Sequence, residues 1–213
     1  MAHPAIFSTL LAYLGAGIPA PSVAPSASFE QQLAIFQGLG FTLNAGVTET
    51  DILRWNGGRE AFEAEPFKLL YITLGQTIER EPWTPLTDRC WDFDTEAIEG
   101  DGAYVRIMTE LSRISRGEVL FTELTDHVDH DLGKAWVEFT FHGKHEQWDF
   151  AAEDDWVDPS LFTRLAALVN KHNTEGHYTY FDTGGQDAVI GYENDEGREK
   201  LRAMTGLAIE WIK

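Results

Sequence analysis

The sequence predicts an α+β protein in which an N-terminal helical part is followed by an antiparallel or mixed sheet with helices packed on one side. Two observations carry this prediction. The first half contains capped helical patterns, and the second half alternates hairpin and helix patterns in the order ββαββαβ, which is typical of such folds. Of the 213 residues, 43% are hydrophobic and 12% aromatic, so the chain can build a sizeable core.

We expect three parts along the chain. Residues 1–28 read as a short apolar helix and an arm rich in Pro, Ala and Ser, residues 29–85 as the helical part, and residues 86–213 as the mixed α+β part. Pro82 and Pro85 interrupt regular structure near the second boundary. The last two parts could equally form one continuous domain.

Two capping boxes mark helix starts in the helical part. Ser28 is followed three residues later by Gln31, and Thr48 is followed by Asp51, the spacing at which side chains and backbone N–H groups pair reciprocally. The apolar run over residues 66–75 is too short for its periodicity to separate a buried helix from a strand.

The best-defined element in the mixed part is a hairpin over residues 135–150. Gly143 followed by Lys144 fits a two-residue type II′ turn, which has Gly first. This turn fixes a register with a buried face and a polar face. The opposed pairs on the buried face are Phe139 with Trp148 and Val137 with Phe150. The opposed pairs on the polar face are Glu138 with Asp149, Thr140 with Gln147 and His142 with His145.

The other elements of the mixed part follow from periodicity and end signals. They are a helix over residues 102–115, a helix starting at Asp158-Pro159, a hairpin around Gly184-Gly185, a helix over residues 194–205 ended by Gly206, and a last strand over residues 207–212.

The formal net charge is −19, and residues 91–160 hold eighteen acidic and five basic residues. Such a balance argues against nucleic acid or an anionic membrane surface as a partner, because both repel acidic proteins. A basic protein would instead be steered toward the middle of the chain. The charge therefore predicts a basic protein partner.

Cys90 is the only cysteine, which excludes an intramolecular disulfide and fits a reducing compartment. No apolar run reaches the length of a membrane helix. Residues 4–27 resemble a signal peptide in their apolar middle, but the first basic side chain is Arg54. We expect a cytoplasmic protein without a cofactor, since no phosphate-binding loop or nucleophile elbow is present.

One segment could bind a metal ion. Asp126, His127, Asp129 and His130 lie within six residues, and carboxylates with imidazoles are ligands for divalent cations. Their spacing matches no known ligand motif, and an exposed turn explains the same residues, because turns collect Asp. A metal site is the alternative interpretation.

The polar hairpin face indicates a docking surface. Opposed carboxylates at Glu138 and Asp149 would repel one another unless a cation meets them, and a solvated face that tolerates this repulsion is the alternative. We expect the partner-binding residues to be Glu138, Asp149, Asp154, Asp155, His142 and His145.

Three stretches, Trp91–Glu99, Asp154–Asp158 and Tyr180–Asp187, resemble segments of bacterial immunity proteins, the partners of polymorphic or contact-dependent toxins. The resemblance implies a cytoplasmic protein that binds and neutralises one cognate toxin and has no catalytic activity. Two other functions stay open from the residues: a metal-dependent hydrolase or phosphoesterase that uses the Asp, His and Glu segments, and a non-enzymatic scaffold or regulator.

Overall fold

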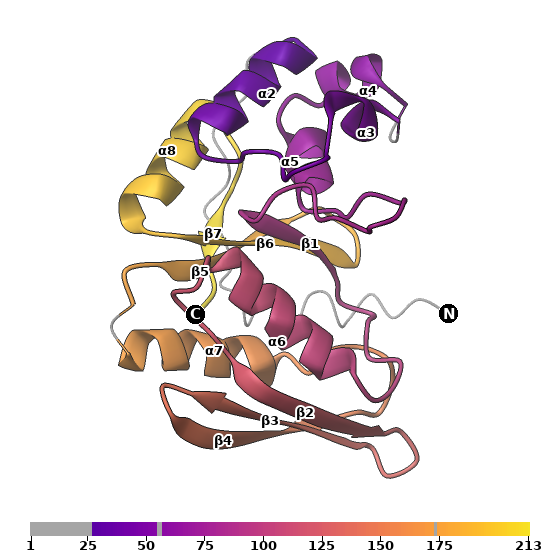
Figure 1. The fold of residues 1–213 in the computed structure, drawn as a ribbon, viewed down its shortest axis with the longest axis vertical. Coiled ribbons are helices and arrows are strands. Elements are labelled where there is room, and N and C mark those ends of the chain that lie inside the picture. Colours follow the sequence, from indigo (N-terminus) through magenta and orange to yellow (C-terminus); the bar gives the residue numbers. More distant parts are fainter. Residues whose placement is uncertain (1–26, 55–56, 173) are drawn as a thin grey trace. The chain divides into compact units, whose positions relative to one another are not determined.

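The computed structural model describes residues 27–54, 57–172 and 174–213. In these ranges it contains seven helices and two sheets, one of four and one of three strands (Figure 1). The α+β class is confirmed. The predicted apolar helix and arm of residues 1–28 lie almost wholly outside the described residues.

The chain divides into two compact units. The three-stranded unit comprises Asp94–His177 and Ile212–Lys213, and the four-stranded unit comprises the described chain up to Phe93 together with Tyr178–Trp211. This division does not follow the expected boundary near residue 85. The reason is that strands from the end of the chain complete a sheet with a strand that precedes the three-stranded unit.

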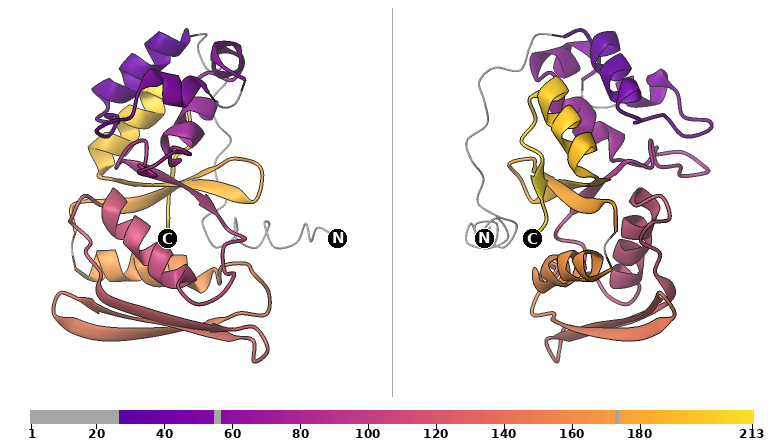
Figure 2. Two further views of the ribbon diagram at one scale, coloured as in Figure 1. Left: turned by 45° about the vertical axis from the view of Figure 1, so that its right-hand side comes forward. Right: turned by 90° about the vertical axis from the view of Figure 1, so that its left-hand side faces the viewer.

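The three-stranded unit has the sheet order β2-β3-β4, and its helices cover one face of that sheet (Figures 1 and 2). Its elements are α6 (Ala103–Ile114), β2 (Thr122–Asp129), β3 (Lys134–Phe141), β4 (Lys144–Ala151) and α7 (Ser160–Lys171).

Both helices of this unit bury the stripe that their periodicity predicts. The buried residues of α6 include the expected Tyr104, Ile107, Met108, Leu111 and Ile114. Those of α7 include Leu161, Leu165, Leu168 and Val169. At the start of α7, the Asp158 carboxylate accepts a hydrogen bond from the N–H of Ser160 (2.8 Å), as a residue at a helix N-terminus does.

The predicted hairpin register is wrong by two residues. Val137 pairs with Trp148 and Phe139 with Glu146, because the turn consists of His142 and Gly143. Their φ angles are 49° and 73°, and positive values at both positions define a type I′ turn, whose twist matches that of the strands. His adopts such values more readily than most residues.

A shift of two residues leaves each side chain on its predicted face. Val137, Phe139, Trp148 and Phe150 are all buried, and the rings of Phe139 and Trp148 meet edge-on with centroids 4.9 Å apart. The pairs on the polar face do change, since Glu138 lies opposite Gln147, and Asp149 lies opposite Trp136.

The expected order ββαββαβ omits two strands, β1 (Cys90–Asp94) and β2. The segment expected to be an exposed turn forms the second half of β2, and only residues 130–133 form the turn to β3. In β2 only Val128 is buried, so the strand lacks the apolar alternation that would identify it in the sequence.

The four-stranded unit has the sheet order β1-β6-β5-β7. Its helices are α2 (Phe29–Gly38), α3 (Glu49–Leu53), α4 (Arg59–Ala64), α5 (Lys68–Leu74) and α8 (Asp195–Thr205), and its later strands are β5 (His177–Asp182), β6 (Asp187–Glu193) and β7 (Glu210–Trp211). The ambiguous segment of residues 66–75 is therefore helical. None of the described helices is both long enough and apolar enough to cross a membrane.

Candidate functional site

The face of the three-stranded sheet that α6 and α7 leave uncovered is the candidate site, and we call it the outer face. Its side chains alternate along the strands with the buried ones. They are Thr125, His127 and Asp129 of β2, Lys134, Trp136, Glu138 and Thr140 of β3, and His145, Gln147, Asp149 and Ala151 of β4.

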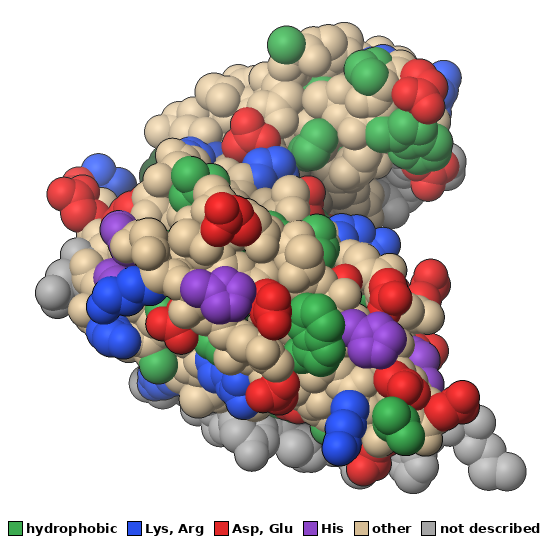
Figure 3. Space-filling view, turned by 60° about the horizontal axis from the view of Figure 1, so that its bottom comes forward, with side chains coloured by type: hydrophobic (Ala, Val, Ile, Leu, Met, Phe, Trp, Pro, Cys, Tyr) green, Lys and Arg blue, Asp and Glu red, His purple; other side chains and the backbone are tan. Residues whose placement is uncertain are grey.

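Acidic and histidine side chains alternate with lysine and arginine on the side of the molecule shown in Figure 3. The outer face is therefore mixed in charge. Asp129 and Lys134, for example, are directly opposed on neighbouring strands, and such opposite charges stabilise a sheet.

The structure brings together some of the predicted docking residues. His145 Nε2 lies 3.8 Å from Glu138 Oε2, and Asp149 is on the same face. His142 is separated from this group, because it belongs to the turn and stacks on His172. The predicted opposition of Glu138 to Asp149 and of His142 to His145 is wrong, and Asp149 is instead a diagonal neighbour of Glu138.

Asp154 and Asp155 gather with other acids at one end of the sheet. The turn after β2 contacts the end of β4, where Ala152 N donates to Gly133 O (3.1 Å). His130 Nδ1 also lies 3.2 Å from Ala152 O. We call the carboxylates of these two segments the acidic end: Asp129, Asp131, Glu153, Asp154 and Asp155.

Two apolar side chains that were not predicted from the sequence border these charges. Leu132, in the turn of the acidic end, is 71% exposed. Trp136 is half-buried at the centre of the outer face, with its ring 6.1 Å from that of His127. Strand alternation places Trp136 outward, between the buried Ala135 and Val137, and this is the signal that could have found it.

The residues of the possible metal site bind other parts of the protein. Asp126 Oδ1 accepts from Gly102 N (2.7 Å) and its Oδ2 from Val105 N (3.1 Å), so this carboxylate caps α6. His127 Nδ1 lies 3.0 Å from Asp101 Oδ1.

The remaining two of these residues, Asp129 and His130, take part in the turn itself. Asp129 Oδ1 accepts from Leu132 N (2.8 Å). Over the whole described chain, no group of three or more His, Cys, Asp or Glu side chains is arranged to hold a metal ion.

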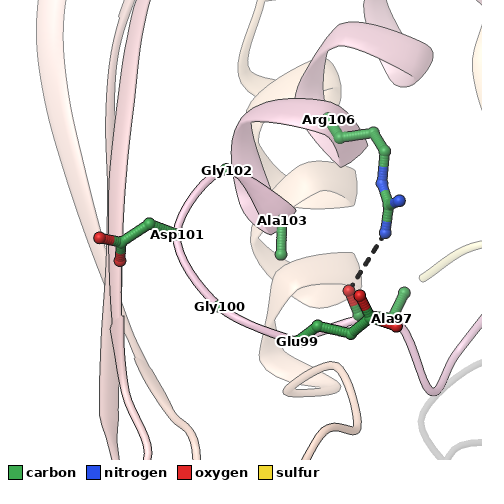
Figure 4. Close-up of a pocket in the computed structure, with 7 residues that line it drawn as sticks. All are labelled: Ala97, Glu99, Gly100, Asp101, Gly102, Ala103 and Arg106. Carbon is green, nitrogen blue, oxygen red and sulfur yellow. Dashed lines mark hydrogen bonds between the residues drawn. The ribbon is translucent and has the colours of Figure 1, made fainter.

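An open pocket of about 240 Å³ lies at the start of α6 (Figure 4). Its lining is Ala97, Glu99, Gly100, Asp101, Gly102, Ala103 and Arg106. Arg106 Nη2 donates to Ala97 O (3.2 Å), and Asp101 points away from the pocket toward β2. The N–H of Val128 and, to a lesser extent, His127 lower the pKa of Asp101. Since Asp126 already caps α6, the pocket presents no unoccupied anion site.

The turn of the hairpin carries a pair of stacked histidines. The rings of His142 and His172 are 4.8 Å apart and 3° from parallel, and Phe141 meets both edge-on. Desolvation lowers the pKa of His172, and the nearby His142, Lys171 and Lys144 lower it further, while Glu146 opposes them.

We expect this stack to make the native state sensitive to acid. Because the native protein binds a proton at His172 less readily than the unfolded chain, the free energy of unfolding falls as the pH drops below about 6.5. Replacing His172 with Gln should reduce this fall, as measured by thermal unfolding at pH 7.5 and 5.5. His145→Gln removes an imidazole outside the stack and serves as the control. An equal loss of stability in wild type and His172→Gln would contradict the prediction.

Comparison with models of protein families, with curated protein sequences and with solved structures gave no significant match to this chain. The candidate function therefore depends on the geometry described above and on the charge of the chain.

Proposed function

We propose that this chain binds a basic protein through the outer face and the acidic end, and that it neutralises that protein in the manner of an immunity protein. The observation that carries the proposal is the combination at one end of the sheet of an exposed apolar side chain, Leu132, with five carboxylates. Protein interfaces commonly combine apolar anchors with a charged, solvated rim.

Charge supports a basic partner. The acidic end holds five acids, and Lys134 is directly opposed to one of them, Asp129. Together with the net charge of −19, this distribution would accelerate association with a positively charged surface.

The alternative of a metal-dependent hydrolase has no comparable support. The carboxylates on which it would depend are hydrogen-bonded to backbone N–H groups, Asp126 at the start of α6 and Asp129 in its own turn.

The test is co-expression with a candidate basic toxin domain, followed by binding kinetics with the purified domain. We expect restored growth and a saturable complex. Changing Asp154 and Asp155 to Asn should slow association several-fold at low salt, with a smaller effect in 0.5 M salt, where charges are screened over about 4 Å.

Glu49→Gln with Glu60→Gln is the matched control, because it removes the same charge from α3 and α4 of the four-stranded unit. Equal association rates for the two double variants would exclude the acidic end from the interface. A toxic domain that is neither bound nor neutralised would contradict the proposed function itself.

A further inference from the structure

The segment between α5 and β1 presents an exposed tryptophan on a closely held loop, residues 76–86, which we call the Trp83 loop. Trp83 is 57% exposed, and every other tryptophan in the described part of the chain is buried or half-buried. Exposing an indole costs stability, because an aromatic side chain buries about 150–250 Å² when it is packed in a core or an interface.

Backbone hydrogen bonds close the stem of this loop. Leu86 N donates to Gln76 O (2.8 Å) and Ile78 N to Thr84 O (2.9 Å), and both Leu86 and Ile78 are buried. Between these two bonds Thr77 and Pro85 form an antiparallel bridge, and Glu79 follows Ile78 at the base of the tip. The tip is therefore attached to the core on both sides.

Arg80 ties the tip of the loop to the segment around Asp51. Its Nε and Nη2 donate to the two carboxylate oxygens of Asp51 (3.1 and 3.0 Å), and Nη2 also donates to Gly46 O (2.8 Å). A two-point pair of this kind is geometrically specific. It also neutralises the positive charge of Arg80, which leaves Glu79 and Glu81 as the unneutralised charges of the loop.

Trp83 itself is held in a restricted conformation. Its φ angle is 27°, which is unfavourable for a residue with a side chain, and its N–H donates to Arg80 O (2.7 Å). The indole Nε1 donates to Glu81 Oε1 (2.9 Å), so one carboxylate orients the ring. An aromatic ring oriented before binding loses little entropy when a partner arrives.

We propose that Trp83, Glu79 and Glu81 form a binding site for a lysine or arginine side chain of a partner protein. A cation over the face of an indole is attracted by the ring. The Glu81 carboxylate, which is hydrogen-bonded to the indole, and the charge of Glu79 in the same loop add charge complementarity. This site lies outside the outer face and the acidic end. It shares with the proposed function only the expectation of a basic partner.

The experiment is selection of a random phage-displayed dodecapeptide library on the wild-type protein. We expect the enriched peptides to contain Lys or Arg beside an apolar residue. As synthetic peptides they should bind Trp83→Ala at least about tenfold more weakly than wild type, as is typical of an aromatic hot spot. Glu81→Gln keeps the ring but removes its charged neighbour, and it should lower the affinity for these peptides several-fold.

Two controls make the outcome decisive. The melting temperature of each variant shows whether it is folded, and Asp154→Asn with Asp155→Asn should leave the affinity for these peptides unchanged. Peptides without Lys or Arg, peptides that bind Trp83→Ala equally well, or no enrichment at all would overturn the site. Loss of binding only in the Asp154 and Asp155 variant would place the contact at the acidic end, so that the failure of this inference and of the proposed function can be distinguished.

Discussion

Replacing Gly75 with Ala should destabilise the protein by about 3 kcal/mol, the upper part of the range for overpacking. A Cβ atom at this position would lie 2.5 Å from the backbone N of Asp92 and 2.9 Å from the carbonyl carbon of Trp91. Both atoms belong to β1, which is hydrogen-bonded to β6 and cannot retreat as a flexible side chain would. The cost is steric, because the φ of −80° and ψ of −10° at Gly75 suit any residue.

Urea denaturation of wild type and Gly75→Ala gives the two free energies of unfolding. Gly38→Ala is the matched control, since a Cβ added there has no neighbour within 4 Å and the residue ends α2. Ala should leave the stability at that site unchanged or raise it by up to about 1 kcal/mol. A change below about 0.5 kcal/mol for Gly75→Ala would show that β1 moves aside.

Removing one partner of the ion pair between Arg89 and Glu193 should cost about 3–5 kcal/mol, because the other charge would remain buried. The atoms Nη2 and Oε1 are 2.5 Å apart, and the two side chains are only 19% and 6% exposed. The Arg89 guanidinium also lies over the ring of Phe41, 5.4 Å from its centroid. Arg89 therefore contributes both charge and packing in the four-stranded unit.

A double-mutant cycle measures this pair. Arg89→Met removes the cation that faces the Glu193 carboxylate, and Glu193→Gln removes the anion that faces Arg89. The combined variant should lose clearly less stability than the sum of the two single losses. The exposed pair of Lys200 with Glu196 is the control, and its coupling energy should be much smaller, because solvent screens exposed charges. If the stability losses of the two single variants add up in the combined variant, the coupling energy of Arg89 with Glu193 is zero and the prediction is wrong.

The sequence alone determined those features that depend on residues near one another along the chain. The capping boxes at Ser28 and Thr48, the buried stripes of α6 and α7, and the glycine that ends α8 all involve partners within a few residues. In the same way, alternation alone assigned the faces of the β3–β4 hairpin.

The candidate sites were only partly predictable. The sequence identified the acids of the outer face and of the loop after β4, but it paired Glu138 with Asp149, because it assigned the wrong residues to the turn. It passed over Trp83 and Leu132, since exposure is not encoded in residue type. The role of Asp126 was also hidden, as the backbone groups that it caps are more than twenty residues away.

Only the tertiary structure decided how distant segments combine. Arg89 and Glu193 are 104 residues apart, and the clash that forbids a side chain at Gly75 comes from a strand sixteen residues later. The four-stranded sheet likewise joins β1 with strands from the end of the chain. Local patterns fix backbone conformation and the faces of each element, because these depend on short-range sterics and hydrogen bonds. Which elements meet depends on the global burial of their apolar faces, and a single sequence does not state those contacts.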